Sequence, residues 1–329
     1  MATLRTIPPD AAPIIETHDL RRTFKGRTSA VEAVRGVDLR VDQGEIYAFL
    51  GPNGAGKTTT LRMLATLLPP TAGDARVAGA DLRRDPVEVR RRIGYVPQGG
   101  STDPAETGRN ELVLQARLYG ADKRTAHARA AEVLDALDLA EAADRTVSTY
   151  SGGMKRRLEI GLGIIHRPRV LFLDEPTTGL DPQARARMWD EVRALREGGT
   201  TVFLTTHYLE EADVLADRLG IIDHGRIVAE GTSDELKRQG AGDVVTLGLD
   251  GASELALDAV RLEPYIREAS AEDGLVRLYV EHGETALPRL LRVLDGAGLA
   301  PSTIALARPS LDDVFLRQTG RSLREAPAA

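Results

Sequence analysis

The stretch that decides the fold is GPNGAGKTTT, residues 51–60. It matches the pattern G-x-x-x-x-G-K-[ST], in which glycines precede a lysine and a hydroxyl residue. Glycine adopts backbone angles closed to other residues, so the backbone N–H groups of such a loop can surround phosphate oxygens. We therefore predict a nucleotide-phosphate site made of Gly51, Pro52, Asn53, Gly54, Ala55, Gly56, Lys57, Thr58 and Thr59.

The residues on either side of this stretch support that interpretation. Residues 45–50 are mostly apolar and predict a buried strand, whereas Leu61, Leu64, Ala65 and Leu68 have the spacing of a helix. The loop then lies between a strand and the positive N-terminus of a helix, which favours anions. Lys57 is expected to reach the β- and γ-phosphates and Thr58 to bind Mg²⁺. A glycine-rich surface turn is the alternative, and these flanking elements make it less favoured.

A second apolar segment, residues 170–175, ends in two carboxylates, Asp174 and Glu175. Ligands of open α/β sheets bind beside the carboxyl ends of the strands. We expect Asp174 to hold Mg²⁺ through its water shell and Glu175 to direct a water at the γ-phosphate. A strand that simply ends in an acidic turn is common, but the phosphate loop favours the catalytic interpretation.

Residues 150–154, YSGGM, form a third motif. Ser151 can cap the helix that follows, and Gly152 and Gly153 leave N–H groups uncovered, which suits an anion. A capped helix with no ligand is the alternative for this motif taken alone.

Composition limits the class of protein. The chain has 329 residues, so two domains are expected, and its net charge of −6 argues against nucleic acid held over a broad basic face. It has no cysteine, which excludes disulfides and thiolate metal sites. No segment approaches the roughly 20 apolar residues that span a bilayer.

Together with Thr178-Gly179-Leu180-Asp181 and the histidine His207 that follows the apolar segment 201–205, these motifs resemble the nucleotide-binding subunit of an ABC transporter. The resemblance covers roughly residues 13–238. It implies an α/β fold of the P-loop NTPase type: a RecA-like α/β core, an antiparallel β subdomain and a helical subdomain at about residues 100–165.

The resemblance also implies roles for individual residues. Phe24 would stack on adenine, although a core phenylalanine of a strand is the alternative. Gln98 would contact Mg²⁺ and sense a membrane partner, and Asp181 would link two active sites. His207 would contact the γ-phosphate, so that Glu175 and His207 form the catalytic pair. Three residues are then expected at the metal, namely Thr58, Gln98 and Asp174, and Ser151, Gly152 and Gly153 would contact ATP.

The third motif departs from the usual Leu-Ser-Gly-Gly-Gln of the family, because Tyr150 and Met154 hold its outer places. Ser151 and Gly153, which would meet phosphate, are intact. The variant resembles that of drug-export and antibiotic self-resistance members.

Residues 243–320 are predicted to form a small α+β domain that regulates or stabilises assembly. Strands are expected at residues 244–249, 275–280 and 302–307, and a helix at Leu287–Leu294. Ser310 and Asp313 can form a capping box before a helix. Its sequence LDDVFL, residues 311–316, followed by Thr319-Gly320-Arg321, resembles the C-terminal extension of daunorubicin-resistance-type ATPases. Residues 1–12 and 321–329 are expected to be flexible tails.

The function implied is that of an ATPase subunit that dimerises head to tail around two ATP and powers efflux of a drug or other hydrophobic compound. A separate integral-membrane permease would be its partner, at the cytoplasmic face of the cell membrane, and no nucleic acid is expected. The alternatives are the ATPase of an importer and a DNA-repair or ribosome-associated ABC ATPase. The absence of sustained heptads disfavours the DNA-repair class, and the presence of one phosphate loop and one SGG motif disfavours the ribosome-associated class. The sequence does not identify the transported compound.

Overall fold

The structure is a computed structural model that describes residues 12–26, 30–240, 242–249, 251–272, 274–307 and 310–319. The predicted tails, apart from residue 12, lie outside this set. The chain divides into two compact units between Glu230 and Gly231. Helix α8 (Ser233–Gly240) therefore belongs to the second unit, whereas the sequence placed the end of the first domain at residue 238.

The first unit contains an antiparallel sheet with the strand order β2-β1-β4-β5. Its strands are β1 (Ile15–Lys25), β2 (Ala30–Val41), β4 (Ala72–Val77) and β5 (Ala80–Asp81). Apolar and polar residues alternate along β2, and the buried ones join a core that includes residues of β3. This sheet corresponds to the expected antiparallel β subdomain.

The second sheet of this unit has the order β10-β9-β3-β8-β7-β6. Its strands are β3 (Ile46–Leu50), β6 (Ile93–Val96), β7 (Val170–Asp174), β8 (Thr201–Thr206), β9 (Arg218–Asp223) and β10 (Arg226–Gly231). The five from β9 to β6 run parallel. Every residue of β3, β7 and β8 is buried, which explains the apolar runs of β3 and β7 and the apolar centre of β8. The carboxyl ends of these central strands meet at one edge of the sheet.

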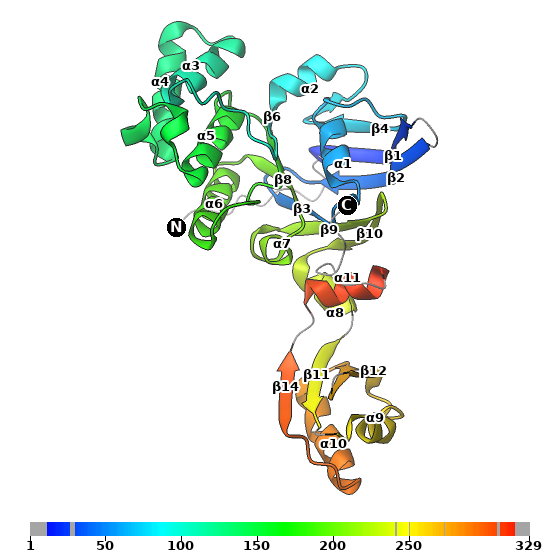
Figure 1. The fold of residues 1–329 in the computed structure, drawn as a ribbon. Helices are drawn as coiled ribbons and strands as arrows, with labels where there is room; N and C mark the ends of the chain where they lie inside the picture. The colour runs from blue at the N-terminus through cyan, green and yellow to red at the C-terminus, as the bar shows by residue number, and fades with distance from the viewer. Residues whose placement is uncertain are drawn as a thin grey trace. The chain divides into compact units, whose positions relative to one another are not determined.

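Helices surround this sheet (Figure 1). They are α1 (Lys57–Leu64), α2 (Pro86–Arg92), α3 (Gly108–Leu118), α4 (Lys123–Ala136), α5 (Gly152–Ile164), α6 (Pro182–Glu197) and α7 (Leu209–Leu215). Helix α1 ends before Leu68 of the predicted stripe, because Thr66 has φ of 62° and turns the chain. Helices α3, α4 and α5 form the helical subdomain, where Leu112 and Val133 approach Gly161 too closely for a larger side chain to fit without displacement.

The second unit has an antiparallel sheet with the order β12-β13-β11-β14. Its strands are β11 (Asp243–Gly248), β12 (Ile266–Glu272), β13 (Leu275–Val280) and β14 (Thr303–Ala307). Helices α9 (Ser253–Val260) and α10 (Gly283–Gly296) share an apolar core with this sheet. The expected α+β fold is present, but the sequence analysis had missed α9 and β12.

Helix α11 (Leu311–Thr319) contacts α8 in the second unit. Val314 and Phe315 are buried, as is Leu236 of α8. The predicted capping box is formed: Ser310 Oγ accepts from the Asp313 N–H at 3.3 Å, and Asp313 Oδ2 accepts from the Ser310 N–H at 2.8 Å.

Candidate functional site

The phosphate loop lies between β3 and α1, and its glycines are required by geometry. A Cβ on Gly51 would collide with the backbone oxygen of Ile222, and one on Gly56 would lie 2.6 Å from the Ala33 oxygen. Gly56, with φ of 107°, also occupies the left-handed region that disfavours other residues. The loop therefore passes close to neighbouring backbone with its amides unobstructed by side chains.

Lys57, the first residue of α1, is only 5% exposed. Its Nζ donates to the backbone oxygens of Gly51 at 2.7 Å and Pro52 at 3.1 Å, and lies 3.4 Å from Glu175 Oε1. Burial lowers the pKa of Lys57, while the negative charge of Glu175 acts to raise it. The fold thus holds a cation within the loop, where the sequence placed the phosphate-binding lysine.

Asp174 is completely buried at the end of β7. Its Oδ1 accepts from Thr58 Oγ1 at 2.9 Å and from Thr205 Oγ1 at 2.7 Å. Its Oδ2 is buried and has no hydrogen-bond partner among the residues that the structure describes. A carboxylate oxygen left in this condition beside a threonine hydroxyl fits Mg²⁺, which prefers oxygen ligands and takes few of them from protein. Thr58 and Asp174 are therefore suited to hold that ion.

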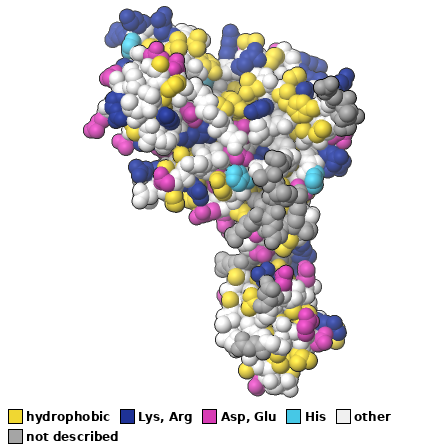
Figure 2. Space-filling model, in the orientation of Figure 1, with side chains coloured by type: hydrophobic (Ala, Val, Ile, Leu, Met, Phe, Trp, Pro, Cys, Tyr) yellow, Lys and Arg dark blue, Asp and Glu magenta, His cyan; other side chains and the backbone are white. Residues whose placement is uncertain are grey.

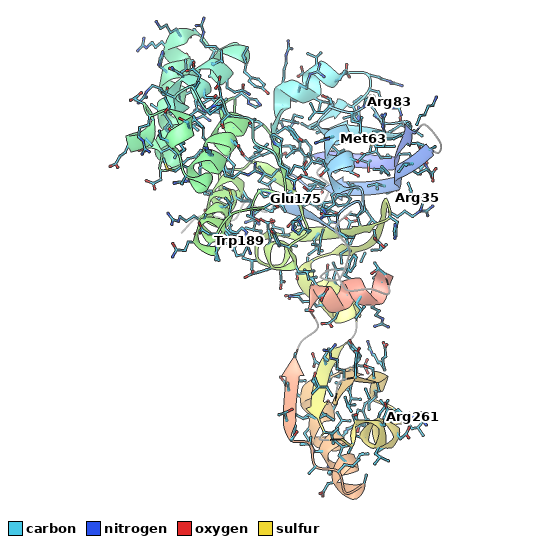
Figure 3. The ribbon with its side chains drawn as sticks, in the orientation of Figure 1. Arg35, Met63, Arg83, Glu175, Trp189 and Arg261 are labelled. Atoms are coloured by element: carbon cyan, nitrogen blue, oxygen red, sulfur yellow. The ribbon has the colours of Figure 1, made fainter. Side chains whose placement is uncertain are left out.

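Glu175 has φ of 46°, a left-handed backbone conformation that turns the chain just after β7. Its Oε2 accepts from Gln98 Nε2 at 2.8 Å and lies 3.1 Å from His207 Nδ1. Thr178 Oγ1 donates to the same oxygen at 3.2 Å. The structure thus brings together the two residues predicted as catalytic and one predicted at the metal. Figure 3 shows Glu175 at the centre of the first unit.

Charges around Glu175 keep it ionised. Burial alone would raise its pKa, but the hydrogen bond with His207 and the charge of Lys57 outweigh burial and lower the pKa from 4.5 to about 2. Glu175 is thus a fixed negative charge that accepts hydrogen bonds from groups on three different segments of the chain.

This pKa predicts how stability depends on pH. A carboxyl with a lowered folded-state pKa stabilises the fold above its unfolded value of 4.5, by up to about 3 kcal/mol, and loses that contribution as pH falls toward 2. We expect the stability lost on Glu175→Gln to be larger at neutral pH than at about pH 3. Urea unfolding of both proteins at the two pH values measures this difference. An unchanged difference would contradict the assigned pKa.

A pocket of about 380 Å³ opens at the loop. It is lined by Ala33, Pro52, Asn53, Gly54, Gly56, Lys57, Thr58, Thr59, Gln98 and Glu175. Most of the predicted phosphate and metal residues therefore share one cavity. Phe24, Ser151 and Asp181 are not among the described residues that line it.

Phe24, Ser151 and Asp181 are exposed. Phe24 is 38% exposed on β1, with the guanidinium of Arg22 4.7 Å from the centre of its ring, so it is not a core residue. Ser151 caps α5 by accepting from the Met154 N–H at 3.2 Å, as predicted. Asp181 caps α6 in the same way. The structure does not bring these residues to the phosphate loop of their own chain.

Sequence analysis missed Thr205 on β8. Its hydroxyl donates to Asp174 Oδ1 and accepts from the Glu175 N–H at 3.1 Å, so it fixes both carboxylate residues. The only sequence signal is the position of Thr205 near the end of a strand parallel to β7, two residues before His207.

Arg156 on α5 was also missed. Its guanidinium is buried and donates to the backbone oxygens of Pro97 at 2.7 Å, Pro176 at 2.8 Å and Asp174 at 3.2 Å, and it pairs with Glu159 at 2.7 Å. One side chain thereby joins the helix that Ser151 caps to the loops that carry Gln98 and Glu175. A basic residue in such a helix gives no local sign of this role.

Comparisons with known proteins agree with this site. A family model described as ABC transporter matches residues 34–178, and one described as the C-terminal domain of DrrA1-3-like ATP-binding proteins matches residues 231–319. The chain is 48% identical over 299 residues to the daunorubicin resistance ATP-binding protein DrrA3 of Streptomyces coeruleorubidus, which covers 91% of this chain and 94% of that protein. The chain belongs to the ABC transporter ATP-binding proteins. It is an ATPase of the daunorubicin-resistance type.

Other relatives of this ABC ATPase have similar names. The daunorubicin/doxorubicin resistance ATP-binding protein DrrA of Streptomyces peucetius is 47% identical, over 95% of this chain and 96% of that protein. The linearmycin resistance ATP-binding protein LnrL of Bacillus subtilis is 34% identical, over 95% of this chain and all of that protein. These matches confirm the family that the sequence motifs predicted.

Solved structures confirm the predicted fold class. The dimeric post-hydrolysis state of the ATP-binding cassette MJ0796, bound to ADP and Pi, matches with a TM-score of 0.61 and 25% identity, over 66% of this chain and 98% of that one. The structure of the ATP-binding subunit of an ABC transporter matches with a TM-score of 0.61 and 29% identity, over 69% of this chain and 92% of that one. Among the described residues of the present ATPase, no helix combines the length and apolar character needed to cross a membrane.

Proposed function

We propose that this ATPase binds two ATP between two head-to-tail copies and uses their hydrolysis to drive a separate membrane permease that exports a drug or other hydrophobic compound. The proposal places the subunit at the cytoplasmic face of the cell membrane. Relatives named for resistance to daunorubicin, doxorubicin and linearmycin support export. A relative solved as a dimer bound to ADP and Pi supports pairing.

The observation that carries the proposal is the division of the predicted residues into two groups. Lys57, Thr58 and Glu175 share the pocket at the phosphate loop, whereas Ser151 and Asp181 are exposed at helix N-termini and do not line it. A helix N-terminus with uncovered amides binds anions. A second copy placed head to tail can bring its Ser151 and Gly152 to the phosphates of the first.

Within this arrangement, each side chain of the pocket has a chemical role. The amides of residues 54–59 and the charge of Lys57 would bind the triphosphate. Mg²⁺, held by Thr58 and Asp174 with Gln98 nearby, would neutralise phosphate charge. Glu175 Oε2 and His207 would orient the attacking water, and His207 would contact the γ-phosphate.

The ion pair between Lys57 and Glu175 couples nucleotide binding to the strength of the base. The charge of Lys57 is one cause of the low pKa of Glu175. Phosphates that share the charge of Lys57 would weaken this cause of the low pKa, whereas Mg²⁺ beside Asp174 would act in the opposite direction.

A mixing experiment tests the head-to-tail pairing. In one copy Lys57→Ala removes the phosphate contact, and in the other Ser151→Arg blocks the helix N-terminus. In a mixed dimer one site contains both substitutions and the other contains neither. We expect each variant alone to be inactive and an equal mixture to regain up to about a quarter of wild-type ATPase activity, because half of randomly formed dimers carry one intact site.

The matched control is the double variant with both substitutions in one chain, mixed with either single variant, because no dimer of that mixture has an intact site. Failure of the two single variants to restore activity when mixed would contradict the head-to-tail site. Recovery would also exclude a site completed within one chain.

A groove between the helical subdomain and the segments around α1, α2 and β6 is suited to the permease. A small pocket of about 150 Å³ is lined by residues that include Leu67, Gln115 and Tyr119. Leu67 is 56% exposed, and Leu118 on α3 is 73% exposed. Figure 2 shows hydrophobic side chains gathered on the upper part of this unit, beside α2. Exposed apolar side chains around a concave site are typical of protein interfaces.

We therefore expect Leu67→Glu to leave basal ATPase activity unchanged while it abolishes copurification with the permease and efflux. A charge in an apolar interface loses its hydration without gaining a partner. Leu255→Glu, at an exposed leucine of α9 in the second unit, is the matched control. Normal efflux by the Leu67→Glu protein would remove this groove from the proposed interface.

A further inference from the structure

Within the described part of the chain, the sheet of the second unit has two open edges of different character. Strand β12 forms one edge and β14 the other (Figure 1). An edge strand presents a row of unpaired backbone N–H and C=O groups, to which another strand can add. Proteins discourage such pairing at edges that remain free, with charged side chains or with irregular register.

Strand β12 has both protective features. Arg267, Glu268 and Glu272 are exposed along it, and Arg267 pairs with Glu281 at 3.0 Å. Its register with β13 shifts between Ile266 and Glu268. A neutral strand that added here would meet charges and an irregular backbone.

Strand β14 has neither feature. Its sequence is Thr303-Ile304-Ala305-Leu306-Ala307, without charge or proline, and its register with β11 is regular. All five residues are exposed, with Ile304 at 43% and Leu306 at 41%. This edge is therefore regular, neutral and apolar, which is the character of an edge that is covered in an assembly.

The apolar pattern of β14 is nearly the same in both directions along the strand, so β14 can pair antiparallel with a copy of itself. Ile304 and Leu306 lie one residue either side of Ala305 and project to the same side as the core residues Leu247 and Val245, their partners in β11. An antiparallel copy centred on Ala305 places Ile304 of each strand opposite Leu306 of the other. The small Ala305 then meets its own copy at the axis.

We propose that β14 pairs antiparallel with β14 of a second copy of this chain, about a two-fold axis at Ala305. The two sheets then join into one, and the contact is isologous, because both copies use the same strand. The charges of the two edges indicate which strand pairs with β14. If β14 paired with the β12 edge of another copy, this neutral strand would lie beside Arg267, Glu268 and Glu272, whereas a second β14 has no charged residue. This interface goes beyond the proposed function, because it uses no nucleotide.

Cysteine cross-linking tests the pairing directly, because the chain has no cysteine of its own. Residues directly opposite in antiparallel strands have Cα atoms about 4.5–5.5 Å apart, within the range that a disulfide spans. We expect full-length Ala305→Cys, mildly oxidised without nucleotide, to run as a disulfide-linked dimer on non-reducing gels. Ser270→Cys, at an exposed position of β12, is the matched control and should stay monomeric.

The proposed register between the two β14 strands predicts a second set of cross-links. Thr303 of one strand lies opposite Ala307 of the other, so Thr303→Cys and Ala307→Cys should cross-link to each other and not to themselves. The Ala305→Cys cross-link should also form in Lys57→Ala protein, which separates this interface from the ATP-dependent one. A monomeric Ala305→Cys protein, or cross-linking of Ala305→Cys mainly to Ser270→Cys, would overturn the proposal.

Discussion

Glu175→Gln is expected to lower the rate of ATP hydrolysis by about 10²- to 10⁴-fold while ATP still binds. The substitution keeps the size of the side chain and an oxygen that accepts hydrogen bonds, so Gln98 and Thr178 retain a partner. It removes the charge that, in the proposed mechanism, orients and deprotonates water. It also removes a negative group from beside Lys57, so affinity for the triphosphate should be equal or higher.

The measurements are steady-state ATPase activity, nucleotide affinity and size in solution. Because the closed dimer opens only after hydrolysis in the proposed cycle, the Glu175→Gln protein should accumulate as a dimer when ATP is present. Glu197→Gln, at the exposed end of α6, is the control for loss of a carboxylate and should behave as wild type. Wild-type turnover by Glu175→Gln would remove Glu175 from the catalytic role.

Lys57→Ala is expected to weaken ATP binding by on the order of 10- to 100-fold, because hydrogen bonds to charged groups contribute about 1.5–3 kcal/mol. ATPase activity should fall with it. The substitution also leaves Glu175 buried without its cation, so the free energy of unfolding should decrease by up to several kcal/mol. This second effect follows from the 3.4 Å ion pair and not from the sequence motif.

A paired variant separates these effects. The double variant Lys57→Ala/Glu175→Gln has neither buried charge, so its free energy of unfolding should be higher than that of Lys57→Ala. Its affinity for ATP should stay low. Lys123→Ala, at an exposed lysine of α4, is the control for charge. Unchanged affinity and turnover in the Lys57→Ala protein would contradict the nucleotide site itself.

Patterns of residues close together in the sequence were enough to predict the phosphate loop, two of the buried strands and two helix caps. The glycines at 51, 54 and 56, the strands that became β3 and β7, and the caps at Ser151 and Ser310 depend on residues a few positions apart. Five motifs in order were enough to predict the family and the fold class. Strand β12 was missed because it is a partly exposed edge strand with charged residues and lacks a continuous apolar run. Helix α9, which has eight residues, was missed as well.

The tertiary structure alone decided how the site is held together. Thr205 and Asp174 are 31 positions apart, and Gln98 and Glu175 are 77 apart, yet each pair forms a hydrogen bond. Arg156 joins its helix to the loops that carry Gln98 and Glu175 in the same way. Such contacts arise because parallel strands end at one edge of a sheet, where residues distant in the chain become neighbours, and no local pattern encodes them. The low pKa of Glu175, which His207 and Lys57 cause, and the strand order that leaves β12 and β14 at the edges of the second sheet also depend on residues far apart in the chain.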